Sequence, residues 1–265
     1  MSDDMKTVQA LFNPAMLSKV IHAKGIDADK LPTKEELDQL TLEKAERTVQ
    51  AKHRRHYYHM SVWSGEVPLR FRFDDWDVTK QRDQSRAREL GNRAFKIARE
   101  LAKQPFNVVL SGERGTGKTS LALAIMAQLM RQGQTCMFVS TAELLRLVND
   151  KYEAPDVRER LMYITKDMKA VDVLILDDFG TEGGKPNEQG FYKPVHKDLQ
   201  TLMYQVANAR CNFETNQARH ATIITTNNTK RELETMYDKK TVDRLMTKNP
   251  AHQLSFDDME GVRNV

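Results

Sequence analysis

Residues 107–125 read Asn-Val-Val-Leu-Ser-Gly-Glu-Arg-Gly-Thr-Gly-Lys-Thr-Ser-Leu-Ala-Leu-Ala-Ile, and this stretch decides the fold. A short apolar run typical of a buried strand leads into a glycine-rich loop, and a helical pattern follows the loop. Four residues separate Gly112 from Gly117, and Lys118 and Thr119 come next, which is the spacing of a phosphate-binding P-loop. The strand before it and the helix after it supply the context that this pattern requires.

The loop predicts a site for the phosphates of ATP. Glycines let backbone N–H groups approach the anion closely, and the positive end of the following helix faces it. We expect Lys118 to reach the β and γ phosphates and Thr119 to offer its hydroxyl to Mg²⁺. The predicted nucleotide-binding residues are Gly112, Glu113, Arg114, Gly115, Thr116, Gly117, Lys118, Thr119 and Ser120.

Outward from the loop, short apolar runs alternate with helical stretches. The apolar runs span residues 106–111, 135–140, 171–177 and 221–226. The candidate helices span residues 118–132, 141–150, 156–169 and 194–209. Such alternation is typical of an α/β fold with a doubly wound parallel sheet, and we predict that architecture together with a small helical domain at the N-terminus.

Polar residues follow two of the predicted strands. Asp177 and Asp178 end an apolar strand whose carboxylates are expected beside the P-loop. We predict that Asp177 and Thr119 bind the Mg²⁺ ion and that Asp178 orients or activates the attacking water. Because Asp is shorter than the Glu more usual at this position, hydrolysis is expected to be slow. Asn227 follows the strand at 221–226 and is a candidate sensor of water or the γ-phosphate, with a simple turn as the alternative.

Residues 1–65 are predicted to form a helical partner-binding domain. Thr33 and Glu36 have the spacing of a capping box, so a helix is expected to begin there. That helix places Leu37, Leu40 and Val49 near one face, but its apolar content is thin for independent stability. We therefore expect it to pack on a partner or on the rest of the chain.

Residues 66–104 are predicted to form a linker and a basic helix, before an ATPase domain at 105–265. Residues 80–103 carry eight Lys and Arg side chains against three acidic ones. A solvated helix face is the simpler interpretation of such a run, and contact with nucleic-acid phosphates is the alternative.

The composition narrows the class of protein. With 40% hydrophobic and 29% charged residues, the chain has the balance of a soluble globular protein, and no apolar run approaches the length of a membrane span. Acidic residues stand at the N-terminus where a secretory signal carries positive charge, so we expect a cytoplasmic protein with Cys136 and Cys211 reduced. His53, His56 and His59 share a helical face, but basic neighbours argue against a metal site there.

Five stretches together resemble the AAA+ helicase loaders of the DnaC/DnaI type and the related transposition helper ATPase IstB. They are Phe73-Asp74-Asp75-Trp76, the loop 112–119, the segment 174–180, Thr226-Asn227 and Val242-Asp243-Arg244-Leu245. The resemblance covers roughly residues 70–263 and implies an AAA+ ATPase domain that self-associates. It also implies that Arg244 acts on the γ-phosphate of a neighbouring subunit, for which a local helix salt bridge is the alternative, and it makes Arg263 a candidate nucleotide sensor.

The resemblance further implies a hexameric replicative DNA helicase and single-stranded DNA as partners. The family binds single-stranded DNA with a region that corresponds here to residues 181–219, where cations mix with aromatic residues as a stacking surface requires. They are Lys185, Phe191, Tyr192, Lys193 and Lys197, and a flexible loop with packing aromatics is the alternative. A transposition helper acting on duplex DNA and a nucleotide-gated adaptor with little turnover remain open as functions.

Overall fold

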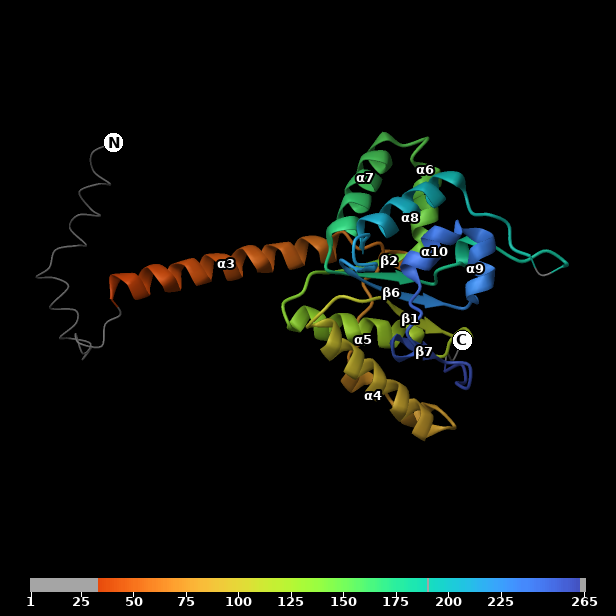
Figure 1. The fold of residues 1–265 in the computed structure, drawn as a ribbon, viewed down its shortest axis with the longest axis horizontal. Coiled ribbons are helices and arrows are strands. Elements are labelled where there is room, and N and C mark those ends of the chain that lie inside the picture. Colours follow the sequence, from red (N-terminus) through yellow and green to blue (C-terminus); the bar gives the residue numbers. More distant parts are fainter. Residues whose placement is uncertain (1–32, 190, 263–265) are drawn as a thin grey trace, which may run out of the picture. The chain divides into compact units, whose positions relative to one another are not determined.

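A parallel sheet of five strands lies at the centre of the folded domain (Figure 1). The computed structural model describes residues 33–189 and 191–262. The strand order is β2-β3-β6-β1-β7, and every neighbouring pair is parallel. The strands are β1 (Val108–Ser111), β2 (Cys136–Ser140), β3 (Val173–Asp177), β6 (Ala221–Thr226) and β7 (Gln253–Ser255). The predicted α/β fold with a parallel sheet is confirmed, while Arg263 lies outside the described residues.

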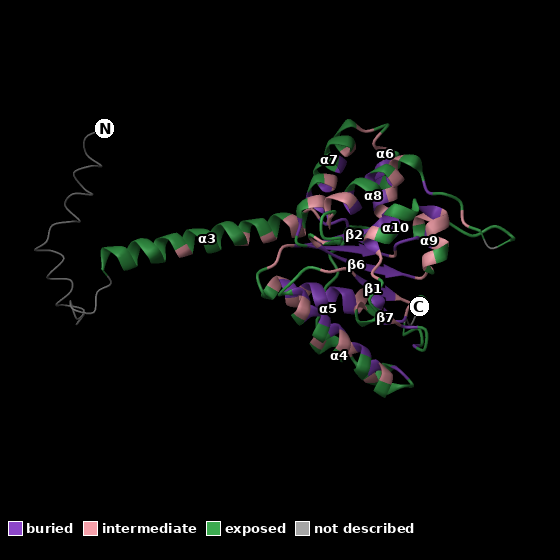
Figure 2. Ribbon diagram, in the orientation of Figure 1, coloured by how far each residue is buried: buried purple, intermediate pink, exposed green. Residues whose placement is uncertain are grey.

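Helices cover both faces of this sheet, because successive side chains of each buried strand point to opposite faces. In β3, Val173 and Ile175 face a core beneath α4 (Gln84–Leu101) and α5 (Lys118–Arg131). Leu174 and Leu176 face a second core on the other side. That core is covered by α6 (Thr141–Asp150), α7 (Pro155–Ala170), α8 (Lys197–Ala209), α9 (Lys230–Met236) and α10 (Lys239–Leu245). Figure 2 shows the buried strands between these two layers.

The segment before the domain core closes the edge of the sheet at β2. The backbone N–H of Val62 donates to Phe138 O at 2.7 Å, and Val62 O accepts from the N–H of Ser140 at 2.8 Å. The ring of Trp63 stacks on Phe138 at a centroid distance of 4.4 Å. Val62, at the end of the predicted N-terminal domain, therefore forms a bridge that satisfies two outer backbone groups of β2.

The opposite edge, β7, was not predicted from the sequence. The guanidinium of Arg93 on α4 donates to Gln253 O at 2.7 Å, and that of Arg86 donates to Ser255 O at 3.3 Å. The apolar side of α4, with Leu90 fully buried, packs against α5. The predicted basic helix is thus part of the domain, and two of its arginines hold the edge of the sheet.

The helix α3 (Lys34–His59) begins with the predicted capping box: the N–H of Glu36 donates to Thr33 Oγ1 at 3.2 Å, and the N–H of Thr33 donates to Glu36 Oε2 at 2.7 Å. The chain divides into two compact units, residues 1–49 and 50–265. In the described part of the first unit, Leu37 and Leu40 are exposed. In the second, His56 Nε2 pairs with Asp167 Oδ2 at 2.8 Å. The functional division at residue 65 stays a prediction.

Short elements complete the chain. The antiparallel pair β4 (Cys211–Asn212) and β5 (Gln217–Ala218) follows α8, and 3-10 turns lie at Ser64–Glu66, Phe73–Asp75, Val78–Lys80, Thr181–Gly183 and Pro250–His252. Arg210, just before β4, is buried and donates to Thr222 Oγ1 and to the carbonyls of Met168, Val171, Asp172 and Ala221. Burial lowers the pKa of Arg210 to about 9. Within the described ranges, no helix has both the length and the apolar character needed to cross a bilayer.

Candidate nucleotide-binding site

The glycine-rich loop lies between β1 and α5, as the sequence predicted. Gly112 and Gly117 have φ angles of 136° and 102°, which favour glycine strongly. Side chains at these positions would also collide with neighbours, since a Cβ atom on Gly112 would lie 2.8 Å from Phe256 and one on Gly117 would lie 2.9 Å from Trp76. Glycine at both positions is therefore required by conformation and by space.

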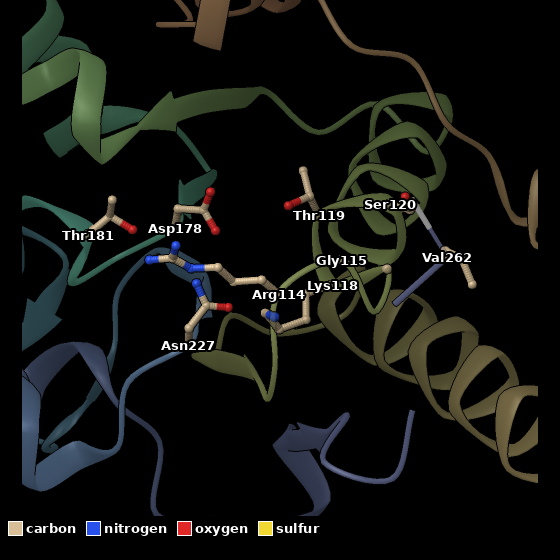
Figure 3. A pocket seen from close by; sticks show the side chains of 10 residues that line it. Arg114, Gly115, Lys118, Thr119, Ser120, Asp178, Thr181, Asn227 and Val262 are labelled. Carbon is tan, nitrogen blue, oxygen red and sulfur yellow. The ribbon is translucent and has the colours of Figure 1, made fainter. Parts of the chain in front are cut away.

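A pocket of about 320 Å³ opens over this loop (Figure 3). It joins the P-loop to the ends of two neighbouring strands and to the C-terminal segment. Its walls are Arg114, Gly115, Gly117, Lys118, Thr119, Ser120, Asp178, Thr181, Asn227 and Val262. Of the predicted binding residues, Gly112, Glu113 and Thr116 shape the loop: Lys118 Nζ donates to the carbonyls of Gly112 and Glu113, and the Thr116 hydroxyl donates to Glu113 O at 2.9 Å.

Asp177 connects the P-loop helix to two strands. Its Oδ1 accepts from the hydroxyl of Thr119 at 2.8 Å and from that of Thr225 at 2.7 Å. The side chain is buried, and this burial, reinforced by the charge of Asp178, raises the pKa of Asp177 to about 6. The carboxyl is still largely ionised at neutral pH, so the predicted pair Thr119 and Asp177 fits a divalent cation bound with the nucleotide.

Asp178 and Asn227 lie at one end of the pocket. Asp178 has a φ angle of 53°, an unusual conformation for a non-glycine residue that is often found at functional sites. Its backbone N–H donates to Thr225 Oγ1 at 2.9 Å. Asn227 Oδ1 is buried and has no hydrogen-bond partner among the described residues, so it fits an acceptor that a bound ligand or water completes.

Arg114 reaches into the same end of the pocket. Figure 3 shows its side chain extending across the loop toward Asp178 and Asn227. The side chain is exposed, and it lines the pocket together with Asp178. Its guanidinium adds to the positive charge that the loop offers to phosphates.

Sequence reasoning missed a polar cluster around Glu182, the residue after Thr181 of the pocket wall. Glu182 Oε2 accepts from the hydroxyl of Thr141 at 2.7 Å and from the N–H of Gly180 at 3.1 Å. Its other oxygen accepts from the hydroxyl of Tyr237. Burial raises the pKa of the Glu182 carboxyl. The cluster ties the turn after Asp178 to α6 and to the end of α9, and three dispersed residues gave no pattern that predicts it.

Arg244 lies in another part of the domain. It lines a separate pocket of about 860 Å³ and does not line the one over the P-loop. Its guanidinium stacks on the rings of Tyr204 and Phe213 at 5.4 and 5.1 Å, and its backbone carbonyl accepts from Asn107 Nδ2 at 2.7 Å. The structure therefore does not bring Arg244 to the ATP site of its own chain, and its predicted role at a neighbouring subunit stays a prediction.

The fold and the site define an ATP-binding P-loop protein of the AAA+ class. The solved structure described as DnaI has a TM-score of 0.50 and 21% sequence identity, with 72% of this chain and 94% of that chain covered, and this likeness concerns the fold. The chain belongs to the family described as IstB-like ATP binding protein, whose sequence profile matches residues 22–256.

Proteins similar to this chain carry two kinds of description. The replicative helicase loader DnaC of Escherichia coli (strain K12) is 23% identical over 141 residues, which are 53% of this chain and 50% of DnaC. The insertion sequence IS1162 putative ATP-binding protein of Pseudomonas fluorescens is 30% identical over 142 residues, which are 53% of this chain and 57% of that protein. The matched regions span about half the length of each relative, so the activity of a whole relative is not transferred by them.

Proposed function

We propose that this protein is an ATPase that loads the replicative DNA helicase onto single-stranded DNA during initiation or restart of replication. The observation that carries the ATPase part is the convergence of Lys118, Asp178 and Asn227 on one pocket. A phosphate-binding loop alone supports nucleotide binding, whereas a carboxylate and a buried amide at the far end of the pocket add groups suited to hydrolysis.

The residues of the pocket have separate roles in the proposed hydrolysis of ATP. Backbone N–H groups of the loop and Lys118 bind the phosphates and hold the γ-phosphate toward Asp178. Thr119 and Asp177 would hold Mg²⁺, which neutralises phosphate charge when it is bound. Asp178 accepts a hydrogen bond from the attacking water, and Asn227 orients that water or the γ-phosphate. Hydrolysis by this shorter acid is expected to be slow and to be stimulated by assembly or by DNA.

Self-association through the ATPase domains would complete the site. Arg244 is separated from the P-loop pocket of its own chain, and a guanidinium brought to the γ-phosphate of a neighbour stabilises charge in the transition state. A subunit on its own would then hydrolyse ATP slowly.

A groove between α7 and α8 supports a role for single-stranded DNA. It has a volume of about 950 Å³ and begins near Tyr152, whose side chain is 68% exposed. Arg158 and Lys166 line it together with Thr201 of α8, which lies in the predicted DNA-binding span 181–219. Cations beside an exposed aromatic ring are the groups that hold a phosphate backbone and stack bases. Phe191, in the loop before α8, is also exposed.

The helicase part of the proposal is supported by α3. None of its residues in the described part of the first unit is buried, and Leu37 and Leu40 are exposed. Apolar residues exposed on a helix are suited to a protein partner. A relative described as a replicative helicase loader agrees with a helicase as that partner.

The second candidate is a transposition helper that acts on duplex DNA. It is favoured by relatives encoded by insertion sequences, one of which, from Bacteroides fragilis, is 26% identical over 203 residues, or 76% of this chain. A third candidate, a nucleotide-gated adaptor, requires ATP binding with little turnover.

Co-elution distinguishes these functions. The full-length protein is mixed with the host's replicative helicase, with and without ATP and single-stranded DNA, and retention on duplex DNA is measured in parallel. The loader proposal predicts a helicase complex that Leu37→Asp with Leu40→Asp removes while ATP binding persists. Absence of any helicase complex, together with ATP-dependent coating of duplex DNA, would contradict the loader proposal and support the transposition function. A helicase complex without measurable ATP hydrolysis would support the nucleotide-gated adaptor.

The groove is tested separately. Arg158→Glu with Lys166→Glu is expected to reduce retention on single-stranded DNA at least about tenfold at low salt, because two phosphate contacts are reversed in sign. The matched control is Lys96→Glu on the basic helix α4, where the side chain is 78% exposed. Loss of DNA retention in the control, but not in the groove variant, would move the contact to α4.

A further inference from the structure

The C-terminal segment forms one end of the ATP pocket. In Figure 3, Val262 and Ser120 lie on one side of the P-loop, and Asp178, Thr181 and Asn227 lie on the other. Val262 is 36% exposed, which makes it a partly accessible apolar side chain in a site whose other walls are mostly polar or glycine. A pocket with an apolar wall at only one of its ends fits a ligand that has one polar and one apolar end.

The polar residues fix the direction in which a nucleotide can lie. Lys118 and the loop bind phosphates, and Asp178 with Asn227 stands where the terminal phosphate is attacked. The nucleoside must then leave the loop toward the end that Ser120 and Val262 line. A flat base is bound mainly by apolar contact, which Val262 is able to provide.

The segment is attached to the P-loop at both of its ends. At its start, the N–H of Phe256 donates to Ser111 O at 2.7 Å, directly before the loop. At its end, the N–H of Val262 donates to Gly115 O at 3.1 Å, within the loop. Between them Met259 is buried in the core beneath α4 and α5. The position of Val262 is therefore set by the same loop that binds the phosphates.

Gln81 holds the middle of the segment. Its side-chain amide donates to Glu260 O at 2.8 Å and accepts from the N–H of Glu260 at 2.9 Å. Gln81 is only 6% exposed, so both hydrogen bonds are shielded from water. A single buried amide thus satisfies both backbone groups of one residue, as a neighbouring strand would.

We propose that residues 257–262 form the wall of the ATP site against which the nucleoside packs, and that Gln81 is the positioning residue of this wall. The proposal rests on the ATP-binding part of the proposed function and on neither DNA nor helicase. It assigns Val262 to contact with the nucleoside and not with the phosphates. Substitutions in this wall should consequently weaken the binding of a nucleotide and leave the binding of a phosphate chain without a nucleoside unchanged.

The first test compares two shortened chains. One ends at Val262 and the other at Glu260, and the affinities of both and of the full chain are measured by calorimetry for Mg²⁺-ATP and for inorganic tripolyphosphate. The chain ending at Val262 is expected to match the full chain. The chain ending at Glu260 is expected to bind ATP about tenfold more weakly, since an apolar contact of this size is lost, and tripolyphosphate unchanged.

Tripolyphosphate serves as the internal control for folding. Equal ATP affinity in both shortened chains would overturn the proposal, as would an equal loss for ATP and tripolyphosphate, which would mean that the segment acts on the loop. A loss already present in the chain ending at Val262 would move the contact to the residues beyond it. A full chain that binds neither ligand would remove the proposed ATPase function itself.

The second test changes Gln81. Gln81→Leu removes both hydrogen bonds to Glu260 at similar volume and is expected to weaken ATP binding about fivefold without affecting tripolyphosphate. Arg82→Ala is the control, because Arg82 forms an exposed ion pair with the Glu260 side chain at 3.2 Å, and such pairs contribute little. An Arg82→Ala effect as large as that of Gln81→Leu would contradict the positioning role.

Discussion

Replacing Asp177 by Asn should stabilise the nucleotide-free protein at alkaline pH while abolishing metal-dependent hydrolysis. The carboxyl is buried, and its pKa is raised from 3.8 to about 6, first by burial and then by the charge of Asp178, against the opposing hydrogen bonds from Thr225 and Thr119. A carboxyl with a higher pKa in the folded than in the unfolded chain stabilises the fold below about pH 4 and loses that contribution as the pH rises through about 6.

The size of the effect follows from the shift. One pKa unit corresponds to about 1.4 kcal/mol, so the shift costs the fold about 3 kcal/mol at pH 8, where Asp177 is ionised in both states. At pH 5, where the carboxyl is ionised mainly in the unfolded chain, the cost is about half of that. Asn keeps an oxygen that accepts from both threonine hydroxyls and carries no charge. The gain in the free energy of unfolding of Asp177→Asn over the wild type should therefore grow by about 1.5 kcal/mol between pH 5 and pH 8.

Urea unfolding of the nucleotide-free proteins at pH 5, 6, 7 and 8 measures this gain. Asp178→Asn is the control, since it removes a half-exposed charge and leaves the buried carboxyl in place, so its gain should be smaller. Saturating Mg²⁺ and ATP should reverse the order of stability, because a bound cation favours the carboxylate. A stability difference between wild type and Asp177→Asn that stays constant across the four pH values would refute the reasoning.

Three further predictions concern other parts of the domain. Arg244→Ala should abolish the rise of specific ATPase activity with protein concentration and leave ATP affinity unchanged; activity that is independent of concentration in the wild type would contradict a role between subunits. Arg210→Met should lower the free energy of unfolding by about 3 kcal/mol or more in urea titrations, because buried carbonyls lose their donor; a loss below about 1 kcal/mol would contradict this. Thiol labelling at pH 8 should modify the half-buried Cys211 first, since burial raises the pKa of the Cys136 thiol, and equally fast labelling of both would oppose that assignment.

The sequence predicts the strands that are buried on both faces. The runs that became β1, β2, β3 and β6 are continuous and apolar because helices cover both sides of them. The strand β7 has three residues, of which only Leu254 is buried, so no pattern along the chain marks it. Its existence depends on pairing with β1, which is a tertiary contact.

In the candidate site, too, the local motifs were predicted from the sequence and the contacts between distant residues were not. The P-loop and the two acids are local motifs and were predicted from spacing, and the structure brings Lys118 and Asp178 to one pocket with Asn227. Thr225 was missed as the second partner of Asp177, although a threonine inside the apolar strand next to β3 is a signal that register could have used. Val262 lies far from the loop in sequence, and nothing local indicates its place.

The arginines of α4 also bear on how copies of this chain can assemble. A bare edge strand can pair with a strand of another molecule and so start open-ended aggregation. At β7 the outward carbonyls of Gln253 and Ser255 are already occupied by Arg93 and Arg86. Adding a strand at this edge would require the loss of those bonds. An ordered oligomer of this chain is therefore expected to form through helices and loops and not through strand pairing at β7.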